Sequence, residues 1–268
     1  MPTTLQDIAD RTRETVDAAC VARPLAELKS AVDACPAPRD FFGAVTGRAQ
    51  EDGVRVIAEF KRCSPSGGAI RPGADPVDIA RRYENAGAVA ISCLTDGPFF
   101  NGSLGDLTAI RDAVALPVLR KDFMIDPYQV WEARAAGADA ILLIAELLAD
   151  DRLEELATLA DTLGLTSVIE VHDRENLLRV QPHLQGRRLL GVNNRNLRTM
   201  TTDLAHVEAM LDDLIDHMDI LICESGIGTR DDIERLGQSG IHRFLIGESL
   251  LRAEDPGSAL QSLLTTPE

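Results

Sequence analysis

The amino-acid sequence predicts an α/β fold, a (βα)8 TIM barrel with an N-terminal helical extension. Three regularities support this fold class: short apolar runs alternate with amphipathic segments, eight such runs follow one another, and glycines recur where the amphipathic segments end. The repeating units span residues 54–264, which fits the size of about 250 residues typical of this barrel. An open, doubly wound sheet has the same order of elements and stays the alternative, because the number of strands does not establish closure.

The apolar runs have the composition of parallel strands that are covered on both faces. Several are rich in β-branched residues and are apolar throughout, instead of alternating between apolar and polar residues. We expect each run to form one strand of the barrel. In chain order the runs occupy residues 54–60, 89–94, 116–119, 140–144, 166–171, 188–192, 219–223 and 243–246.

The segments between the runs are predicted helices. They carry apolar residues at three- and four-residue spacing and open with Asp, Ser, Thr or Pro. Four glycines close such segments just before a strand, where a left-handed backbone favours glycine: Gly87, Gly137, Gly164 and Gly240. The helical segments include residues 76–84, 104–114, 127–136, 151–163, 203–211 and 230–236, with a short one at 248–252.

Residues 1–50 lie outside the repeat and are predicted to form a helical extension of the barrel of residues 51–268, within one structural domain. Their pattern predicts helices over 5–22, 24–34 and 41–45. The extension either closes the bottom of the barrel or covers its mouth, and the pattern alone leaves both roles open.

Composition excludes several classes of function. The net charge is −16 and no run of Lys and Arg exceeds two residues, so nucleic-acid binding is not expected. The longest apolar stretch, 138–145, is too short to span a membrane, and the first residues do not resemble a signal peptide. Five widely spaced cysteines without a Cys-x-x-Cys pattern predict neither disulfides nor a zinc site. We therefore expect a cytoplasmic protein without a metal or other cofactor.

Polar side chains follow most of the predicted strands. In a TIM barrel these positions converge on one mouth, where active sites lie. Charged groups gathered there must pair with one another or with a ligand, and lysines beside glutamates can separate their pKa values into an acid and a base. The candidates in chain order are Glu59, Lys61, Lys121, Glu170, Asn193, Arg195, Glu224, Ser225 and Glu248.

A phosphate site is predicted after the last two strands. TIM barrels often hold phosphate on backbone amides of these loops and of a short helix that follows them. The candidates are Ser64, Gly226, Gly247 and the amide of Glu248, whose carboxylate must point away from a bound dianion. A backbone role for Gly247 predicts that Gly247→Val raises KM.

Other motifs give weaker signals. The Gly-x-Gly at 226–228 has no further glycine at the spacing of a dinucleotide site. The histidines lack metal-ligand spacing, although His172 follows a strand and could support the site. Cys63 and Cys223 lie near the mouth without an adjacent histidine, so we interpret both as packing residues.

Seven motifs in order along the barrel resemble those of the indole-3-glycerol phosphate synthase family. The resemblance covers the whole barrel, and the N-terminal helices are similar to that family's extension over the active-site mouth. The motifs are residues 57–66, 94–96 with 100–103, 119–123, 169–173, 191–197, 224–227 and 244–250.

The resemblance implies a small phosphorylated substrate, 1-(2-carboxyphenylamino)-1-deoxyribulose 5-phosphate, which is converted by ring closure, decarboxylation and dehydration in tryptophan biosynthesis. It implies that Lys121 is the general acid of ring closure, and that Lys61, Glu59 and Glu170 serve the later steps, with their division of labour open. Further residues are implied to bind other parts of the substrate: Asn193, Arg195, Glu224, Ser225, Phe123, Phe100, Leu142 and Pro65. The substrate phosphate is implied to be bound by Ser64, Gly226, Gly247 and Glu248.

Two departures from the family pattern and two alternatives remain. Gly67 stands where many relatives carry Lys, and Gly97-Pro98 stands in a loop that is usually charged. Phosphoribosylanthranilate isomerase, also a phosphate-binding barrel, would need a Cys/Asp acid–base pair, whereas the first strand offers Glu59 and Lys61. A non-catalytic barrel that binds a sugar phosphate would not require both acid and base.

Overall fold

The computed structural model describes residues 5–47, 53–65, 67–196 and 201–265. The predicted boundary between residues 50 and 51 therefore lies outside the described residues, as do Ser66 and Leu197 of the family motifs.

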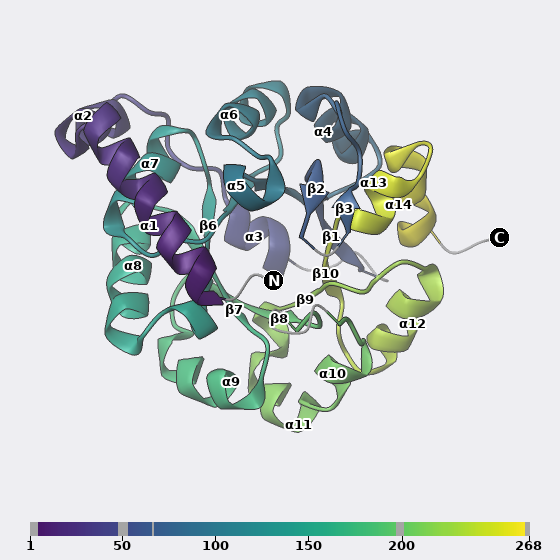
Figure 1. The fold of residues 1–268 in the computed structure, drawn as a ribbon. Helices are drawn as coiled ribbons and strands as arrows, with labels where there is room; N and C mark the ends of the chain where they lie inside the picture. The colour runs from purple at the N-terminus through teal and green to yellow at the C-terminus, as the bar shows by residue number, and fades with distance from the viewer. Residues whose placement is uncertain (1–4, 48–52, 66, 197–200, 266–268) are drawn as a thin grey trace.

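Eight parallel strands close into a barrel in the order β1-β10-β9-β8-β7-β6-β5-β4, so closure, and not an open sheet, is confirmed. The first and last strands pair directly, with Ile57 opposite Leu245. Figure 1 shows the helices arranged around these strands. The strands are β1 (Arg55–Phe60), β4 (Ala90–Leu94), β5 (Val118–Lys121), β6 (Ala140–Ile144), β7 (Thr166–Val171), β8 (Arg188–Asn193), β9 (Leu221–Glu224) and β10 (Arg243–Ile246).

Most of the longer barrel helices begin at capping side chains, as the sequence predicts. Asp75, Ser103, Asp126, Asp173 and Thr229 each accept a hydrogen bond from an amide in the first turn that follows. The longer helices are α4 (Pro76–Asn85), α6 (Leu104–Ala113), α7 (Pro127–Ala135), α8 (Asp150–Thr162), α9 (Arg174–Val180), α12 (Arg230–Gln238) and α14 (Pro256–Leu264). Helix α8 is an exception, because it has Ala149 at its N-cap and no side-chain cap.

Shorter elements fill the connections. An antiparallel hairpin follows β1, and one-turn helices follow several strands. They are β2 (Cys63–Ser64), β3 (Gly68–Ala69), α5 (Gly97–Phe100), α10 (Ala205–Glu208), α11 (Leu211–Leu214) and α13 (Glu248–Arg252), with 3₁₀ turns η1 (Ala145–Leu147), η2 (Gln181–His183) and η3 (Ile215–Ile220).

Some predicted boundaries differ from those observed. β5 begins at Val118, after Pro117, which lacks the N–H that a strand interior requires. β9 begins at Leu221 because η3 occupies the residues before it. The helix predicted over 203–211 is divided between α10 and α11. The four predicted helix-ending glycines all have a positive φ, from +74° to +96°.

Two apolar layers hold the barrel together. One lies between the strands and the surrounding helices. The other fills the barrel interior with side chains from every second position of the strands, and Phe41 and Val45 from helix α3 (Phe41–Thr46) complete it. Phe41 and Val45 are both fully buried. Helix α3 therefore closes one end of the barrel.

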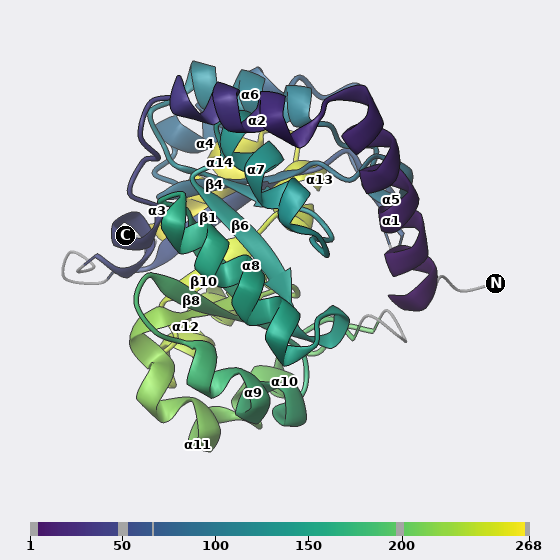
Figure 2. The ribbon, with the colours of Figure 1, turned by 90° about the vertical axis from the view of Figure 1, so that its left-hand side faces the viewer.

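The first helix, α1 (Leu5–Ala22), lies at the opposite end. Figure 2 shows α1 and α3 on opposite sides of the barrel. The Tyr128 hydroxyl of α7 donates to the carbonyls of Ala19 and Arg23 at 2.9 and 2.8 Å, and Leu28 of α2 (Leu25–Asp33) packs against the same tyrosine. The two roles left open for the extension are thus divided between different helices: α3 packs into one end, and α1 reaches the other.

Candidate active site

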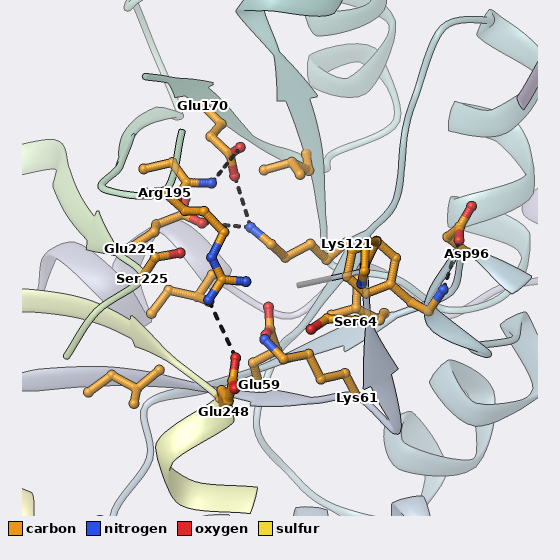
Figure 3. Close-up of a pocket in the computed structure, with 18 of the residues that line it drawn as sticks. Glu59, Lys61, Ser64, Asp96, Lys121, Glu170, Arg195, Glu224, Ser225 and Glu248 are labelled. Carbon is orange, nitrogen blue, oxygen red and sulfur yellow. Dashed lines mark hydrogen bonds and ion pairs between the residues drawn. The ribbon is translucent and has the colours of Figure 1, made fainter. Parts of the chain in front are cut away.

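A pocket opens at the carboxyl ends of the strands, and every residue predicted for the site lines it. The charged side chains come from β1, β5, β7, β9 and α13 and from the residues that follow β1 and β8, and they point toward one another (Figure 3). These residues are Glu59, Lys61, Ser64, Pro65, Phe100, Lys121, Phe123, Leu142, Glu170, Asn193, Arg195, Glu224, Ser225, Gly226, Gly247 and Glu248.

Lys121, the last residue of β5, lies between two carboxylates. Its Nζ is 2.9 Å from Oε2 of Glu170 and 2.6 Å from Oε2 of Glu224. Burial opposes the charge of Lys121, but Glu170, Glu224 and Glu59 outweigh burial and raise the pKa of the ammonium. Lys121 is therefore protonated at neutral pH.

The two carboxylates that hold Lys121 have opposite pKa shifts. Burial, reinforced by Glu170, raises the pKa of Glu224 despite the attraction of Lys121. The pKa of Glu170 is lowered: burial opposes its charge, but Lys121 and a 3.1 Å hydrogen bond from Asn193 Nδ2 outweigh burial. One group thus favours its proton and the other its charge, which is the condition for an acid and a base at one pH.

A second pair of oppositely charged side chains lies beside the first. Lys61 and Glu59 form an ion pair, and both side chains are nearly buried. The two side chains therefore lie on the same side of the chain where it leaves β1. Two lysines and four glutamates therefore line the pocket: Lys61, Lys121, Glu59, Glu170, Glu224 and Glu248.

The loops after β9 and β10 enclose the region predicted for phosphate. Gly226 has φ +87°, and Ser225 has φ +65°, a left-handed conformation uncommon for a residue with a Cβ. The side chain of buried Asn194 holds this turn by donating to the carbonyls of Glu224 and Ser225 at 3.0 and 3.2 Å. These hydrogen bonds stabilise the strained turn beside the pocket.

Gly247 has a role that the sequence analysis missed. A Cβ at this position would lie 2.6 Å from Oε1 and 2.8 Å from Cβ of Glu59. The glycine therefore makes room for the Glu59 side chain, in addition to any backbone contact with a ligand.

One wall of the pocket is apolar. The rings of Phe100 and Phe123 lie 6.1 Å apart at an interplanar angle of 44°, beside Pro65 and Leu142. Ile8 of α1 also lines the pocket, so the N-terminal extension contributes a side chain to the site.

Two acidic residues of the pocket were also missed as site residues. Asp96, which follows β4, accepts hydrogen bonds from the amides of Phe99 and Phe100 at 2.6 and 3.1 Å, and burial raises its pKa to about 6. Asp122 follows Lys121 and holds the buried Arg120 in an ion pair at 3.0 Å. Both residues closely follow the end of a strand, and this position is the sequence signal that could have identified them as site residues. The other lining residues that the sequence analysis did not predict are Leu94, Ile144, Ile227, Leu245, Ile246 and Ser249.

Residues interpreted as non-catalytic do not line the pocket. Cys223 is buried, which raises its pKa to about 12 and keeps it a thiol. His172 Nδ1 is 2.8 Å from the carbonyl oxygen of Asn193, so it supports the site through the backbone. His206 stacks on His172 with ring centroids 4.3 Å apart.

The part of the chain that the structure describes contains no group of three or more His, Cys, Asp or Glu residues that could hold a metal ion. Within the same ranges, none of the helices combines the length and apolar character needed to cross a membrane.

Comparison with known proteins identifies the family. The family model described as indole-3-glycerol phosphate synthase matches residues 5–263. The chain is 47% identical to the protein named indole-3-glycerol phosphate synthase from Rhodopirellula baltica, with 98% of this chain and 100% of the relative covered. It is 46% identical to the protein of the same name from Desulfosudis oleivorans, with 98% of each chain covered.

Solved structures support the fold. The 3-hexulose-6-phosphate synthase from Salmonella typhimurium is similar with a TM-score of 0.57 and 14% identity, covering 78% of this chain and 96% of that one. The thiamine phosphate pyrophosphorylase from Pyrococcus furiosus is similar with the same TM-score and 18% identity, covering 79% and 94%. At this identity the likeness concerns the fold alone. The family match over nearly the whole chain, together with relatives at 46 and 47% identity, establishes that the chain belongs to the indole-3-glycerol phosphate synthase family.

Proposed function

We propose that this protein is a carboxy-lyase of tryptophan biosynthesis that converts 1-(2-carboxyphenylamino)-1-deoxyribulose 5-phosphate into indole-3-glycerol phosphate. The observation that carries this proposal is the position of Lys121, held at 2.9 and 2.6 Å by Glu170 and Glu224 and facing the same pocket as the Lys61–Glu59 pair and an apolar wall. Binding alone does not require two sets of oppositely charged side chains around one cavity.

Ring closure is assigned to Lys121. The arene carbon that bears the carboxylate attacks the ribulose carbonyl carbon, a C–C bond forms, and the carbonyl oxygen takes a proton from the Lys121 ammonium. The raised pKa of Lys121 keeps it protonated until that oxygen gains negative charge. Breaking the C–C bond to the carboxylate then releases CO2, and its electron pair returns to the ring.

Dehydration follows ring closure. The departing hydroxyl takes a proton and leaves as water, while a base removes the proton of the anilinic nitrogen. Loss of a proton from the adjacent methylene carbon and return of a proton to nitrogen then complete the indole ring. Lys61, Glu59 and Glu170 are the groups in place for these transfers, since all three line the pocket beside Lys121. The lowered pKa of Glu170 supports its role as the base.

The remaining predicted residues orient the substrate. Phe100, Phe123, Pro65 and Leu142 accept the aryl ring, and the apolar surface leaves its carboxylate poorly solvated, which favours loss of CO2. Asn193 orients the sugar hydroxyls, Arg195 and Glu224 form the charge network, and Ser225 binds polar groups of the substrate. The phosphate is held by Ser64, the backbones of Gly226 and Gly247, and the amide of Glu248.

The reaction needs no redox or group-carrying cofactor, because every step is a proton transfer or a bond rearrangement within the substrate. Each of the five cysteines lies in the described part of the chain and is free, which supports a location in the reducing cytoplasm.

Fluorescence after addition of the carboxyphenylamino substrate tests the function. Appearance of the indole product supports the synthase. Binding without turnover would instead indicate a non-catalytic sugar-phosphate binder. Turnover of phosphoribosylanthranilate, the substrate of the neighbouring isomerase, would contradict the proposal.

A further inference from the structure

Arg252, at the end of α13, connects two segments that border the pocket but does not itself line it. Its Nε and Nη2 lie 3.0 and 2.9 Å from Oε1 of Glu248, one helical turn earlier. The same Nη2 donates to the carbonyl oxygen of Gly67 at 2.8 Å. Arg252 thus joins the carboxylate of Glu248 to the loop after β1.

The carboxylate of Glu248 is held from two sides. Arg252 contacts Oε1, and Nη2 of Arg195 lies 3.4 Å from Oε2 (Figure 3). Burial opposes the charge of Glu248, but Arg252, Lys61 and Arg195 outweigh burial and lower its pKa. Glu248 is therefore a carboxylate at neutral pH, and it follows directly on Gly247 in the proposed phosphate region.

Gly67 leaves the space that this arrangement occupies. A Cβ at position 67 would lie 2.9 Å from Oε1 of Glu248, 2.9 Å from Oγ of Ser64 and 3.1 Å from Nη2 of Arg252. The amide of Gly67 also donates to Ser64 Oγ at 2.9 Å. The glycine that departs from the family's lysine thus leaves room for the Arg252–Glu248 ion pair.

We propose that Arg252 is a positioning residue that holds the Glu248 carboxylate away from the substrate phosphate. The inference rests on the proposed function, because it assumes that phosphate lies near Ser64 and Gly247. A carboxylate released from Arg252 turns toward Lys61 and Arg195, the other two cations that lower its pKa, and thereby approaches the bound dianion. Like charges brought together in this way weaken binding.

The exposure of the Arg252 and Glu248 side chains distinguishes a role in positioning from a purely structural role. The side chains of Arg252 and Glu248 are 45 and 28% exposed. Exposed ion pairs one turn apart contribute little to stability. Loss of Arg252 is therefore expected to change substrate binding much more than thermal unfolding.

The test is a double-mutant cycle on the full-length protein. Arg252→Ala is expected to raise KM about tenfold with kcat within about twofold of wild type. In a Glu248→Gln background, the same change is expected to alter KM less than about twofold. Arg252→Lys, which keeps a positive charge near Glu248, should restore part of the affinity. Arg152→Ala is the matched control, because Arg152 is 42% exposed and forms an ion pair with Glu155 on the outer helix α8.

Inorganic phosphate provides a readout that does not require turnover. Calorimetry should show about tenfold weaker phosphate binding to Arg252→Ala than to wild type. An unchanged affinity, or a loss of affinity that persists in the Glu248→Gln background, overturns the role of Arg252. Absence of turnover by the wild-type protein would instead contradict the proposed function, and the phosphate measurement would still decide the role of Arg252.

Discussion

Oε1 of Glu224 lies so close to Gly191 that a Cβ on residue 191 would be only 2.3 Å from it. Gly191 is in the middle of β8, and Glu224 ends β9, the neighbouring strand. The same oxygen is buried without a hydrogen-bond partner among the described residues. Glycine in a strand interior weakens the strand, so its presence here is explained by the room it gives to Glu224.

Gly191→Ala is expected to displace Glu224 from Lys121 and to lower kcat at least tenfold. Because Glu224 helps to raise the pKa of Lys121, the pH profile of kcat should also shift. Steady-state kinetics over a pH series measures both effects. Gly105→Ala is the control, because the nearest atom that its Cβ would meet, Ser103 Oγ, is at 3.5 Å. Normal kcat for Gly191→Ala would show that Glu224 need not occupy this position.

Lys121→Ala is expected to reduce kcat by about 10²–10⁴-fold, because a positioned proton donor contributes that much. Lys121→Arg should also fail, since a guanidinium keeps the charge but hardly releases its proton. Turnover assays together with circular dichroism distinguish lost chemistry from lost fold. Near-normal turnover by Lys121→Arg would show that charge alone suffices and would contradict the general-acid role.

The location of the site could be predicted from the sequence because the fold class determines it. Once eight apolar runs predict parallel strands in a barrel, the residues after those strands must meet at one mouth. Glu59, Lys121, Glu170 and Glu224 could therefore be placed together although up to 165 positions separate them, counting from residue 59 to residue 224.

Contacts between distant side chains could not be predicted in the same way. Nothing in the local pattern indicates that Gly191 makes room for Glu224, or that Ile8 of α1 reaches the pocket, because packing of separate elements decides both. Helix α5 was missed because its four residues carry no periodic pattern, and its stability depends on the Asp96 carboxylate.

Gly247→Val is expected to lower kcat as well as to raise KM. The earlier expectation of an effect on KM rested on access of phosphate to the backbone. The structure adds a collision with Glu59, whose Oε1 would lie 2.6 Å from the new Cβ. Separate determination of kcat and KM checks this result. An increase in KM at unchanged kcat would show that Glu59 moves aside without loss of chemistry.

Asp96→Asn is expected to stabilise the protein above pH 6. Asp96 has a pKa of about 6 in the folded state against 3.8 when unperturbed, so the folded state retains a proton that the unfolded state releases. Stability is therefore lost as the pH rises from about 4 to 6, and this loss persists at higher pH. Asparagine keeps the oxygen that caps α5 without the charge. Thermal unfolding should show a gain in Tm of about 2–6 °C at pH 8 that shrinks toward pH 4. A difference in Tm that does not vary with pH would contradict the raised pKa.

Ile8→Asp is expected to raise KM about tenfold and also to lower the unfolding temperature, because Ile8 belongs to a buried apolar cluster. Ile8 is 4% exposed and lines the pocket from α1, so an aspartate there brings a negative charge toward an anionic substrate. Val21→Asp is the matched control on the same helix, because Val21 is 85% exposed. Kinetics and thermal unfolding of both variants separate the two roles considered for the extension. If Ile8→Asp melts early but binds substrate normally while folded, α1 serves packing alone. If KM rises at a temperature where circular dichroism shows the variant to be folded, α1 forms part of the substrate site.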